Sequence, residues 1–444
     1  MNRVHRVRRQ GKRLAGLAPV AALAFAAAER AAGPVHAGMA AVAMRNLLHD
    51  KVRFLITLAG ITVAIVLIFL QGGMYLGFMK SASGMIDRTD ADVWVVSRNS
   101  PNFDWSRPFP ERYLNKARST PGVAEAKTLI FGWGFLRLPG GGTEQVEIIG
   151  YHPPVGGGWG AVEAGGRAPR AEPAWGAPRP SGKALGGWGE PSGFVSGDAS
   201  SVLGGDNIIL DESGCRKLGG LSVGDTTEIM GHEARVTGMT RGLRSLTTAP
   251  YVFASYGTAK KLISYIGERN TVFILARAEP GVSPTELKRR LAERLPNVDV
   301  LTKSEYSRRT KLYWTIQTGM GFGFLMMTFL AFVVGLAIVG QTVYAATMEH
   351  LREYATLKAL GATDSEVRTI LWSQAAASAL LGYVLSIVVV WWLARALEGL
   401  GLPVAIPPWL YAAVFCLGIV LCLAASVVSV RKALSLDPAM VFRA

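Results

Sequence analysis

The sequence predicts an α-helical membrane protein with four transmembrane helices and a large α+β extracytoplasmic (periplasmic) domain between helices 1 and 2. Of its 444 residues, 50% are hydrophobic, and the mean hydropathy is +0.27. Charge-free runs longer than the roughly 20 apolar residues that cross a bilayer occur in four places. These runs are 54–79, 312–348, 369–394 and 399–430. In the last run, Pro403, Pro407 and Pro408 favour a loop, so we expect its helix to cover 409–430.

The first 43 residues have two competing interpretations. Basic residues at 3–13, an apolar stretch at 14–28 and small residues near His36 resemble a signal peptide. Cleavage there would leave a new N-terminus just ahead of a further span. The alternative is that the natural chain starts at Met39 or Met44. Residues 1–43 are therefore treated as an N-terminal extension that need not be native, and residues 44–79 as a cytoplasmic flank with the first helix.

Positive charge predicts the orientation in the membrane. Ten Lys or Arg residues lie between Arg3 and Arg53, ahead of the first span and at its start. The loop 349–366 and the tail 431–444 also carry basic residues, whereas the loop after the third span has Arg395 offset by Glu398. By the positive-inside rule, both termini and the loop 349–366 are cytoplasmic. Residues 80–311 then lie outside the membrane on the opposite side.

The external segment 80–311 has the pattern of a small β-rich domain. Alternating apolar residues predict strands at 91–96 and 145–149, and short stretches separated by glycines predict further strands at 207–211, 226–230 and 234–238, with another at 298–301. Ser283-Pro-Thr-Glu286 predicts the start of a helix that runs to about Leu295. By contrast, the Gly-, Pro- and Trp-rich stretch at about 153–205 lacks the apolar residues of a core, and we interpret it as a long loop or insert.

A second capping box, Thr302-Lys-Ser-Glu305, predicts a helix that continues into the second span. At the helical rise per residue, the run 312–348 would be roughly 55 Å long, against a bilayer core of about 30 Å. The excess length predicts a continuous stalk that rises from the membrane into the outer domain.

The polar loop 349–366 has the pattern of a hinged helix. Apolar residues recur at three-residue spacing with charged residues between them. Gly361 stands where a helix commonly ends, and Thr363 and Glu366 have the capping spacing that starts the next helix. A half-apolar helix at a membrane surface is a candidate docking site for a partner. The candidate coupling residues are Arg352, Glu353, Tyr354, Leu357, Lys358, Leu360, Gly361 and Ala362.

Catalytic and metal-binding patterns are missing from the sequence. Gly182-Lys183 lacks the preceding glycine and the following Ser or Thr of a phosphate-binding loop. None of the six histidines pairs with a cysteine at metal-ligand spacing. We therefore predict that the chain is not an enzyme by itself and holds no cofactor and no metal.

The spans also lack Asp, Glu, Lys and Arg, which ion-coupled transporters use to carry their ion. Energy for transport must then come from a partner at the cytoplasmic face. The net charge of +15 does not indicate nucleic acid, because no basic run is interleaved with aromatic residues. The basic N-terminal arm suits anionic membrane lipid instead.

Two pairs of glycines have the G-x-x-x-G spacing that allows helices to approach closely, Gly73 with Gly77 and Gly319 with Gly323. They are candidates for helix packing or for a dimer contact. The alternative is that they reflect only the high frequency of glycine in membrane helices.

The layout of the chain can be compared with known families. The segment Arg352-Glu-Tyr-Ala-Thr-Leu-Lys-Ala-Leu-Gly-Ala-Thr363, the C-terminal Ser429-Val-Arg-Lys-Ala-Leu-Ser-Leu-Asp-Pro438 and the order of spans resemble the MacB/FtsX-type ABC transporter permeases. Ala91-Asp-Val-Trp-Val and residues 207–360 resemble the DevC-like branch. The resemblance covers about 44–444, and the chain departs from it at its N-terminal extension and at the insert near 153–205.

This resemblance implies a multi-pass permease of the inner membrane that forms a homodimer with two copies of a separate cytoplasmic ABC ATPase, which binds the ATP. It also implies a periplasmic adaptor (membrane fusion) protein, an outer-membrane channel, and export of a lipid-like or hydrophobic substrate by mechanotransmission. It places Arg352, Glu353, Leu357, Lys358 and Gly361 at the contact with the ATPase. Two other functions within the resemblance stay open: an FtsX-like regulator of a cell-wall hydrolase, and a lipoprotein-releasing permease.

Overall fold

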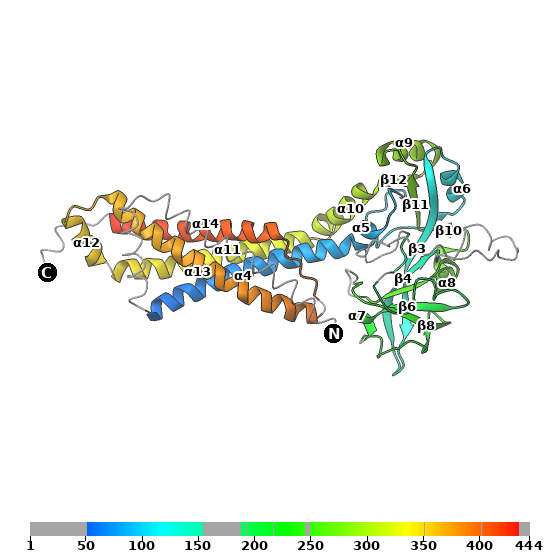
Figure 1. Ribbon diagram of the computed structural model, residues 1–444, viewed down its shortest axis with the longest axis horizontal. Helices are drawn as coiled ribbons and strands as arrows, with labels where there is room; N and C mark the ends of the chain where they lie inside the picture. Colours follow the sequence, from blue (N-terminus) through cyan, green and yellow to red (C-terminus); the bar gives the residue numbers. More distant parts are fainter. Residues whose placement is uncertain are drawn as a thin grey trace, which may run out of the picture. The chain divides into compact units, whose positions relative to one another are not determined.

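The computed structural model describes residues 51–153, 188–191, 193–215, 217–243, 245, 249–349, 351–400 and 402–434. The N-terminal extension 1–43 and the end of the tail lie outside the described residues. The chain divides into two compact units (Figure 1). A helical unit contains the described residues up to Gly73, Phe324–Ala396 and those from Ile406 onward, and a mixed α/β unit contains Met74–Gly323 and Leu397–Ala405.

Four described helices are long and apolar enough to cross a membrane, which confirms the four predicted spans. They are α4 (Lys51–Ala82), α11 (Met320–Glu349), α13 (Asp364–Gly399) and α14 (Pro408–Leu434). The most apolar window of each has a mean hydropathy between 2.0 and 2.5. Helix α12 (Leu351–Ala359) stands between α11 and α13 in the chain. The proline at the start of α14 is common there, because the first helical residue needs no N–H partner.

Glycines let the helices of the helical unit approach closely. A Cβ atom on Gly335 of α11 would lie 2.6 Å from Cβ of Ala64 in α4. A Cβ atom on Gly382 of α13 would lie 2.4 Å from the Cγ2 of Ile61, also in α4. Small residues at such contacts increase the van der Waals packing between membrane helices. Helix α4 is therefore packed against both α11 and α13.

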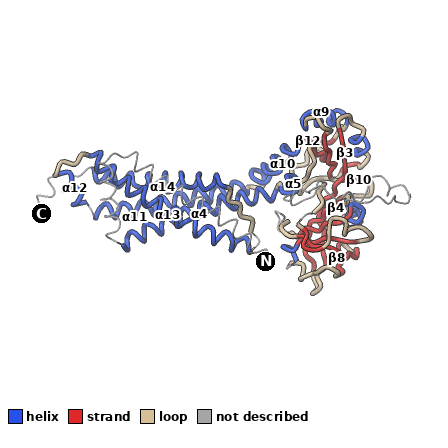
Figure 2. The backbone as a smooth tube through the Cα atoms, in the orientation of Figure 1, coloured by secondary structure: helices blue, strands red, loops and turns tan. Residues whose placement is uncertain are grey.

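The mixed unit is built on a ten-stranded sheet (Figure 2) with the order β12-β1-β11-β3-β4-β9-β6-β8-β5, and β7 pairs with β3 and β8. The strands of this sheet are β1 (Val93–Ser97), β3 (Val123–Arg137), β4 (Thr143–Tyr151), β5 (Phe194–Ser196), β6 (Asn207–Asp211), β7 (Thr226–Ile229), β8 (His232–Thr240), β9 (Tyr251–Ser255), β11 (Phe273–Ala278) and β12 (Val298–Thr302). A separate two-stranded sheet pairs β2 (Phe109–Pro110) with β10 (Asn270–Thr271). All six strands predicted from the sequence are present.

Strand β3 joins the two halves of this sheet. Its first half, from Val123 to Leu129, pairs with β11, and its second half, from Ile130 to Arg137, pairs with β4. The helices of the unit are α5 (Gly84–Arg88), α6 (Tyr113–Arg118), α7 (Glu212–Cys215), α8 (Tyr256–Leu262), α9 (Pro284–Arg294) and α10 (Lys303–Leu312). The fold is thus a mixed α/β domain placed in the chain between the first and second membrane helices.

Strand β1 is buried on both of its faces. Val93 and Val95 belong to a core that includes residues of α6 and α9. Trp94 and Val96 belong to the larger core on the other face of the sheet. Because side chains alternate across a strand, a continuous apolar run is what a strand covered on both sides requires.

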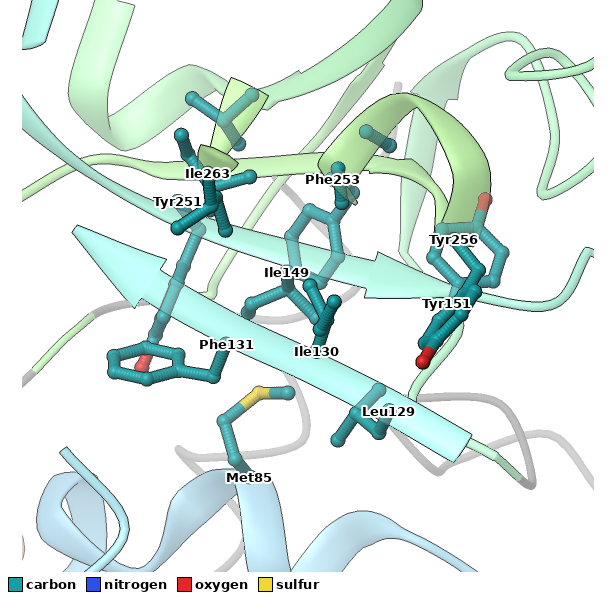
Figure 3. Packing of buried hydrophobic residues seen from close by; sticks show 14 of the residues in the cluster. Met85, Leu129, Ile130, Phe131, Ile149, Tyr151, Tyr251, Phe253, Tyr256 and Ile263 are labelled. Carbon is teal, nitrogen blue, oxygen red and sulfur yellow. The ribbon is translucent and has the colours of Figure 1, made fainter. Parts of the chain in front are cut away.

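The larger core is seen from close by in Figure 3. Phe131 and Leu129 extend from β3 toward Met85, which comes from α5, the short helix that follows the first membrane helix. Tyr151 of β4 and Tyr256 of α8 lie at the other end of the same cluster. This core therefore ties the end of the first span to the centre of the sheet.

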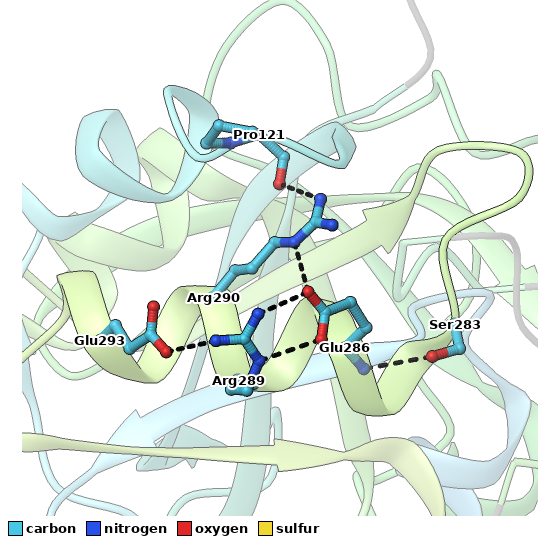
Figure 4. Close-up of polar contacts among 6 residues, drawn as sticks. All are labelled: Pro121, Ser283, Glu286, Arg289, Arg290 and Glu293. Atoms are coloured by element: carbon cyan, nitrogen blue, oxygen red, sulfur yellow. Dashed lines mark hydrogen bonds and ion pairs between the residues drawn. The ribbon is translucent and has the colours of Figure 1, made fainter.

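Helix α9 begins where the sequence predicts (Figure 4). The Ser283 hydroxyl accepts a hydrogen bond of 3.2 Å from the backbone N–H of Glu286. The Glu286 carboxylate in turn accepts one of 2.8 Å from Arg290, whose guanidinium also donates to the carbonyl oxygen of Pro121 at 3.2 Å. The helix is therefore capped and tied to the loop ahead of β3.

The predicted insert at about 153–205 is too long at its C-terminal end. Residues 154–187 lie outside the described residues, but the chain from Trp188 onward is largely described and packs into the domain. Lys127 Nζ lies 4.6 Å and the Arg277 guanidinium 4.7 Å from the centroid of the Trp188 ring. The side chain is 6% exposed. The glycine-rich composition predicts a loop here, but a few large side chains, such as Trp188, are enough to pack this segment into the domain.

The prediction of one continuous stalk helix through 312–348 is also wrong. Helix α10 has the predicted capping box between Thr302 and Glu305 and ends at Leu312. A π-helical turn, η2 (Tyr313–Gln317), follows it. Gly319 then has φ of 73°, and α11 begins at Met320.

Local chemistry accounts for this interruption. The hydroxyl of Thr315 donates to the carbonyl of Lys311 at 2.8 Å, and that of Thr318 donates to the carbonyl of Trp314 at 2.6 Å. Such bonds compete with the helical ladder and distort helices. A residue with positive φ cannot continue a right-handed helix, and glycine adopts that conformation without strain. The second span is therefore separated from α10 by a joint.

Candidate functional site

The turn between α12 and α13 has the predicted form of a helix, a glycine stop and a restart. Gly361 has φ of 103°, and its N–H donates to the carbonyl of Lys358 at 3.1 Å. The Glu366 carboxylate accepts hydrogen bonds from the N–H of Thr363 at 2.7 Å and from its hydroxyl at 3.0 Å. The side chain of Glu366 therefore caps the N-terminus of α13 by bonding back to Thr363, which is one of the two hydrogen bonds of a capping box.

One face of α12 is packed against the membrane helices. Tyr354 is 2% exposed and clusters with Val367 and Leu371 of α13 and with Val430 of α14. Its hydroxyl donates a hydrogen bond of 3.4 Å to the Gln374 side chain. Burial raises the pKa of Tyr354 to about 12. This side chain attaches α12 to α13, so it is a positioning residue rather than part of an exposed docking surface.

An ion pair crosses the turn. The Lys358 ammonium lies 2.9 Å from the Asp364 carboxylate, and only 12% of the lysine side chain is exposed. The carboxylate is near the N-terminus of α13, where negative charge is favoured by the helix dipole. Lys358 therefore helps to fix the angle between the two helices.

The exposed side of the segment carries Glu353, Leu360 and Gly361. Leu360 is 80% exposed, which leaves a large apolar side chain at the turn. Ala362 is half-buried. The backbone of Arg352 and Leu357 is in α12, but their side chains lie outside what the structure describes. Of the predicted coupling residues, Glu353, Leu360 and Gly361 are exposed, and Tyr354 and Lys358 hold the turn in place.

The sequence did not identify the partners of this segment. Asp364 could have been inferred, because an acidic residue at a helix start is a common signal. Val430 could not, because nothing in the local pattern connects it with a tyrosine far earlier in the chain. The packing of three helices at this point is a tertiary property.

A second junction lies ahead of α11 in the chain, within the mixed unit. Trp314 of η2 packs with Met79 and Ala82 at the end of α4. Its indole Nε1 donates a hydrogen bond of 3.0 Å to the carboxylate of Asp104. Burial raises the pKa of Asp104 to about 6. The end of α4, the turn η2 ahead of α11 and the loop that carries Asp104 therefore meet around one buried carboxyl group.

The four candidate glycines lie in different surroundings. Gly73 and Gly77 are buried, and a Cβ atom on Gly77 would lie 2.3 Å from the carbonyl oxygen of Pro403. Gly77 therefore makes its close approach inside the chain, to the α13–α14 connection. Gly319 precedes α11 and Gly323 lies within it, and both are exposed. A dimer contact at any of the four stays a prediction.

Comparison with known families matches most of the described chain. The model of the MacB-like periplasmic core domain matches residues 54–294, more than half of the 444 residues. The model of the FtsX-like permease C-terminal matches residues 325–438.

Individual relatives have low sequence identity. An uncharacterised ABC transporter permease of Mycobacterium tuberculosis is 26% identical over 405 residues, which are 90% of this chain and 98% of the relative. One from Mycobacterium bovis is 23% identical over 401 residues, again 90% and 98% of the two chains. Among solved structures, the periplasmic region of MacB from Actinobacillus actinomycetemcomitans matches with 12% identity and a TM-score of 0.31, covering 50% of this chain and 94% of that one. The extracellular domain of the transporter YknZ from Gram-positive bacteria matches with 10% identity and a TM-score of 0.29, covering 48% and 98%.

Proposed function

This chain belongs to the MacB/FtsX-type ABC transporter permeases, and we propose that it passes ATP-driven motion from a separate cytoplasmic ATPase to its periplasmic domain. It is a multi-pass membrane protein, and its family implies the ATPase partner. We further propose that both termini and the turn at Gly361 are on the cytoplasmic side, as the distribution of basic residues favours. The narrower assignment to the DevC-like branch stays a prediction.

The observation that carries this proposal is the two-sided character of α12. Its buried side, through Tyr354, is attached to α13 and α14. Its other side and the following turn present Glu353, Leu360 and Gly361 to the surroundings. A surface that is exposed yet fixed to membrane helices can convert a push by a partner into displacement of those helices. An exposed Leu360 suits an apolar hollow on such a partner.

The interruption between α10 and α11 supports transmission of motion to the periplasmic domain through a hinge rather than through a rigid stalk. The π-helical turn and the positive φ of Gly319 allow the second span to change direction relative to α10 without breaking a long helix. Few-residue hinges of this kind absorb the dihedral changes of domain motion. Motion of the second span would then reach the domain through the contacts of Trp314.

The remaining features of the proposed system follow from the family. We propose a homodimer of this permease, with a periplasmic adaptor protein and an outer-membrane channel as further partners. The cargo proposed is a lipid-like or hydrophobic molecule taken up outside the membrane spans. The absence of ionisable residues in the apolar runs supports an energy source in a partner.

A pair of matched substitutions tests the coupling role. The tagged full chain would be purified in mild detergent from its native host, and co-purified ABC ATPase would be quantified by mass spectrometry. Leu360→Asp should reduce the bound ATPase by about tenfold, because it places a charge in an apolar contact. Val223→Asp, at an apolar residue that is 44% exposed in the mixed unit, is the control. Equal retention of the ATPase by both variants would contradict the proposal.

A further inference from the structure

The mixed unit contains a cavity of about 340 Å³ whose walls come from three separate parts of the chain. One wall is the outer end of α4 with α5, including Lys80, Gly84 and Arg88. The second is the connection between β8 and β9, with Leu243. The third is the α13–α14 connection at Pro403–Ala405. Cavities of this size are within the range that holds small ligands.

Chain connectivity places this cavity at the edge of the bilayer. The candidate first span ends at Ala82, so Lys80 and Gly84 stand at its boundary. The α13–α14 connection joins two further spans, and it reaches the same side of the membrane as the mixed unit after two more crossings. The close approach of Gly77 to the carbonyl of Pro403 holds these two walls together. By this connectivity the cavity stands next to the ends of candidate spans, on the side of the membrane that carries the mixed unit.

The charge in the cavity is positive. Lys80 and Arg88 line it, and neither forms an ion pair with a residue that the structure describes. Three acidic residues lie nearby, and each has a hydrogen-bond partner: Asp87, Glu147 and Asp104, which interacts with the lining residue Tyr251 and accepts from Trp314. Asp87 accepts from Ser83 at 2.6 Å and lies 3.4 Å from the Lys311 ammonium. The buried Glu147 accepts from the hydroxyl of Ser245.

The rest of the lining is apolar and glycine-rich. Met85, Leu243 and Tyr251 are buried side chains that face the cavity. A Cβ atom on Gly84 would meet no atom within 4 Å, so this wall stays open. A cavity lined by two unpaired cations and by apolar side chains is suited to an amphiphile with a negatively charged headgroup. Headgroups of this kind attract basic residues at membrane surfaces.

We propose that this cavity binds a phosphate-bearing anion, and that the headgroup of an anionic phospholipid in the adjoining leaflet supplies it. Lys80 and Arg88 donate charge-assisted hydrogen bonds to the phosphate oxygens. Met85 and Leu243 contact the start of the acyl region. The bound lipid contacts the end of α4 with α5, the β8–β9 connection and the α13–α14 connection, all within the mixed unit. This assignment does not depend on the proposed coupling role or on the identity of the cargo.

The test uses the purified full chain in an uncharged detergent, with thermal unfolding followed as each ligand is titrated. The probes are short-chain phosphatidylglycerol, short-chain phosphatidylcholine and inorganic phosphate. A ligand that binds the folded state raises the unfolding temperature in a saturable way. We expect saturation with phosphatidylglycerol, and an apparent affinity at least about tenfold weaker in the double variant Lys80→Gln, Arg88→Gln, since it loses two charge-assisted bonds.

Two further variants separate the site from general charge effects. The double variant Arg98→Gln, Arg308→Gln removes the same charge at exposed positions away from the cavity and should bind as the wild type does. Gly84→Phe keeps both cations but fills the cavity, and it should abolish the saturable shift. Equal weakening in the two double variants, or unchanged binding in Gly84→Phe, overturns the proposal. Inorganic phosphate as effective as phosphatidylglycerol would support the anion site and overturn its assignment to a lipid.

Discussion

Trp314 Nε1 donates a 3.0 Å hydrogen bond to Oδ2 of Asp104, an acid nine-tenths or more buried at the joint ahead of the second span. Asn102 donates to the same oxygen at 3.1 Å. Among the residues that the structure describes, no lysine or arginine pairs with this carboxyl group. A carboxylate held only by neutral donors in an apolar site costs free energy, and this cost depends on pH.

The first prediction concerns this pH dependence. Burial raises the folded-state pKa of Asp104 from 3.8 to about 6, so the folded protein holds this proton more tightly than the unfolded chain. The contribution of Asp104 to stability is therefore unfavourable above pH 6 and is relieved as the pH falls toward 4, by roughly 3 kcal/mol in total. Asp104→Asn should remove this dependence, measured as the change in unfolding free energy or amide exchange between pH 7 and pH 4.

The comparison must be made between variants, since other carboxylates lose their native interactions in acid. Glu233→Gln, at an exposed residue, is the matched control and should keep the slope of the wild type. If Asp104→Asn and Glu233→Gln give the same pH profile, the buried carboxyl group is not the source of the effect.

The sequence predicts the local features of this fold well. Gly361 and the spacing of Thr363 and Glu366 specify the turn after α12 because caps involve only neighbouring residues. The four apolar runs predict the spans because the length and composition of a segment alone decide whether it can cross a membrane. Strand β1 is predicted from an alternating local pattern, and the structure shows instead a continuous apolar run that is buried on both faces.

Features that depend on distant contacts are not predictable in this way. Strand β3 is the longest in the sheet, yet Gly132 and Gly134 interrupt its apolar pattern. The structure gives the reason, because a Cβ atom on Gly132 would lie 2.6 Å from atoms of both Ile263 and Tyr265. The interruption at Gly319 is also not predictable, because the run 312–348 is apolar enough for one helix and only the positive φ of Gly319 shows where the helix breaks.

The second prediction concerns the attachment of α12. Tyr354→Ala should destabilise the packing of α12 on α13 by about 3–5 kcal/mol, because it removes a buried aromatic ring. Tyr354→Phe loses only the 3.4 Å hydrogen bond to Gln374 and should cost about 1 kcal/mol. Amide exchange of residues 351–359 in the detergent-solubilised chain measures the difference. Similar exchange in both variants would show that the ring does not hold the helix.

The third prediction separates backbone strain from lack of space. Gly361 has φ of 103° and open space around it, so Gly361→Ala should destabilise the turn by about 1–2 kcal/mol through conformation alone. Gly323 also has open space but lies inside α11 without a positive φ. Gly323→Ala should therefore be neutral or stabilise by up to about 1 kcal/mol. Thermal unfolding of the two variants side by side tests this, and equal effects would contradict it.

The fourth prediction concerns the ion pair across the turn. Lys358→Asp and Asp364→Lys each place like charges at the 2.9 Å contact, so each should loosen the turn. The double swap restores opposite charges, although the lysine then stands at the start of α13, where the helix dipole disfavours it. We expect partial recovery, with a coupling energy of about 0.5–1 kcal/mol, because Asp364 is largely exposed and solvent screens the pair.

Amide exchange of residues 359–366 would report this coupling, and ATP hydrolysis by the reconstituted complex would report its use. If Lys358 acts by positioning the turn, the double swap should recover both readouts together. Recovery of exchange protection without recovery of hydrolysis would instead mean that the lysine itself contacts the ATPase. That result would move Lys358 from the positioning residues to the docking surface beside Glu353 and Leu360.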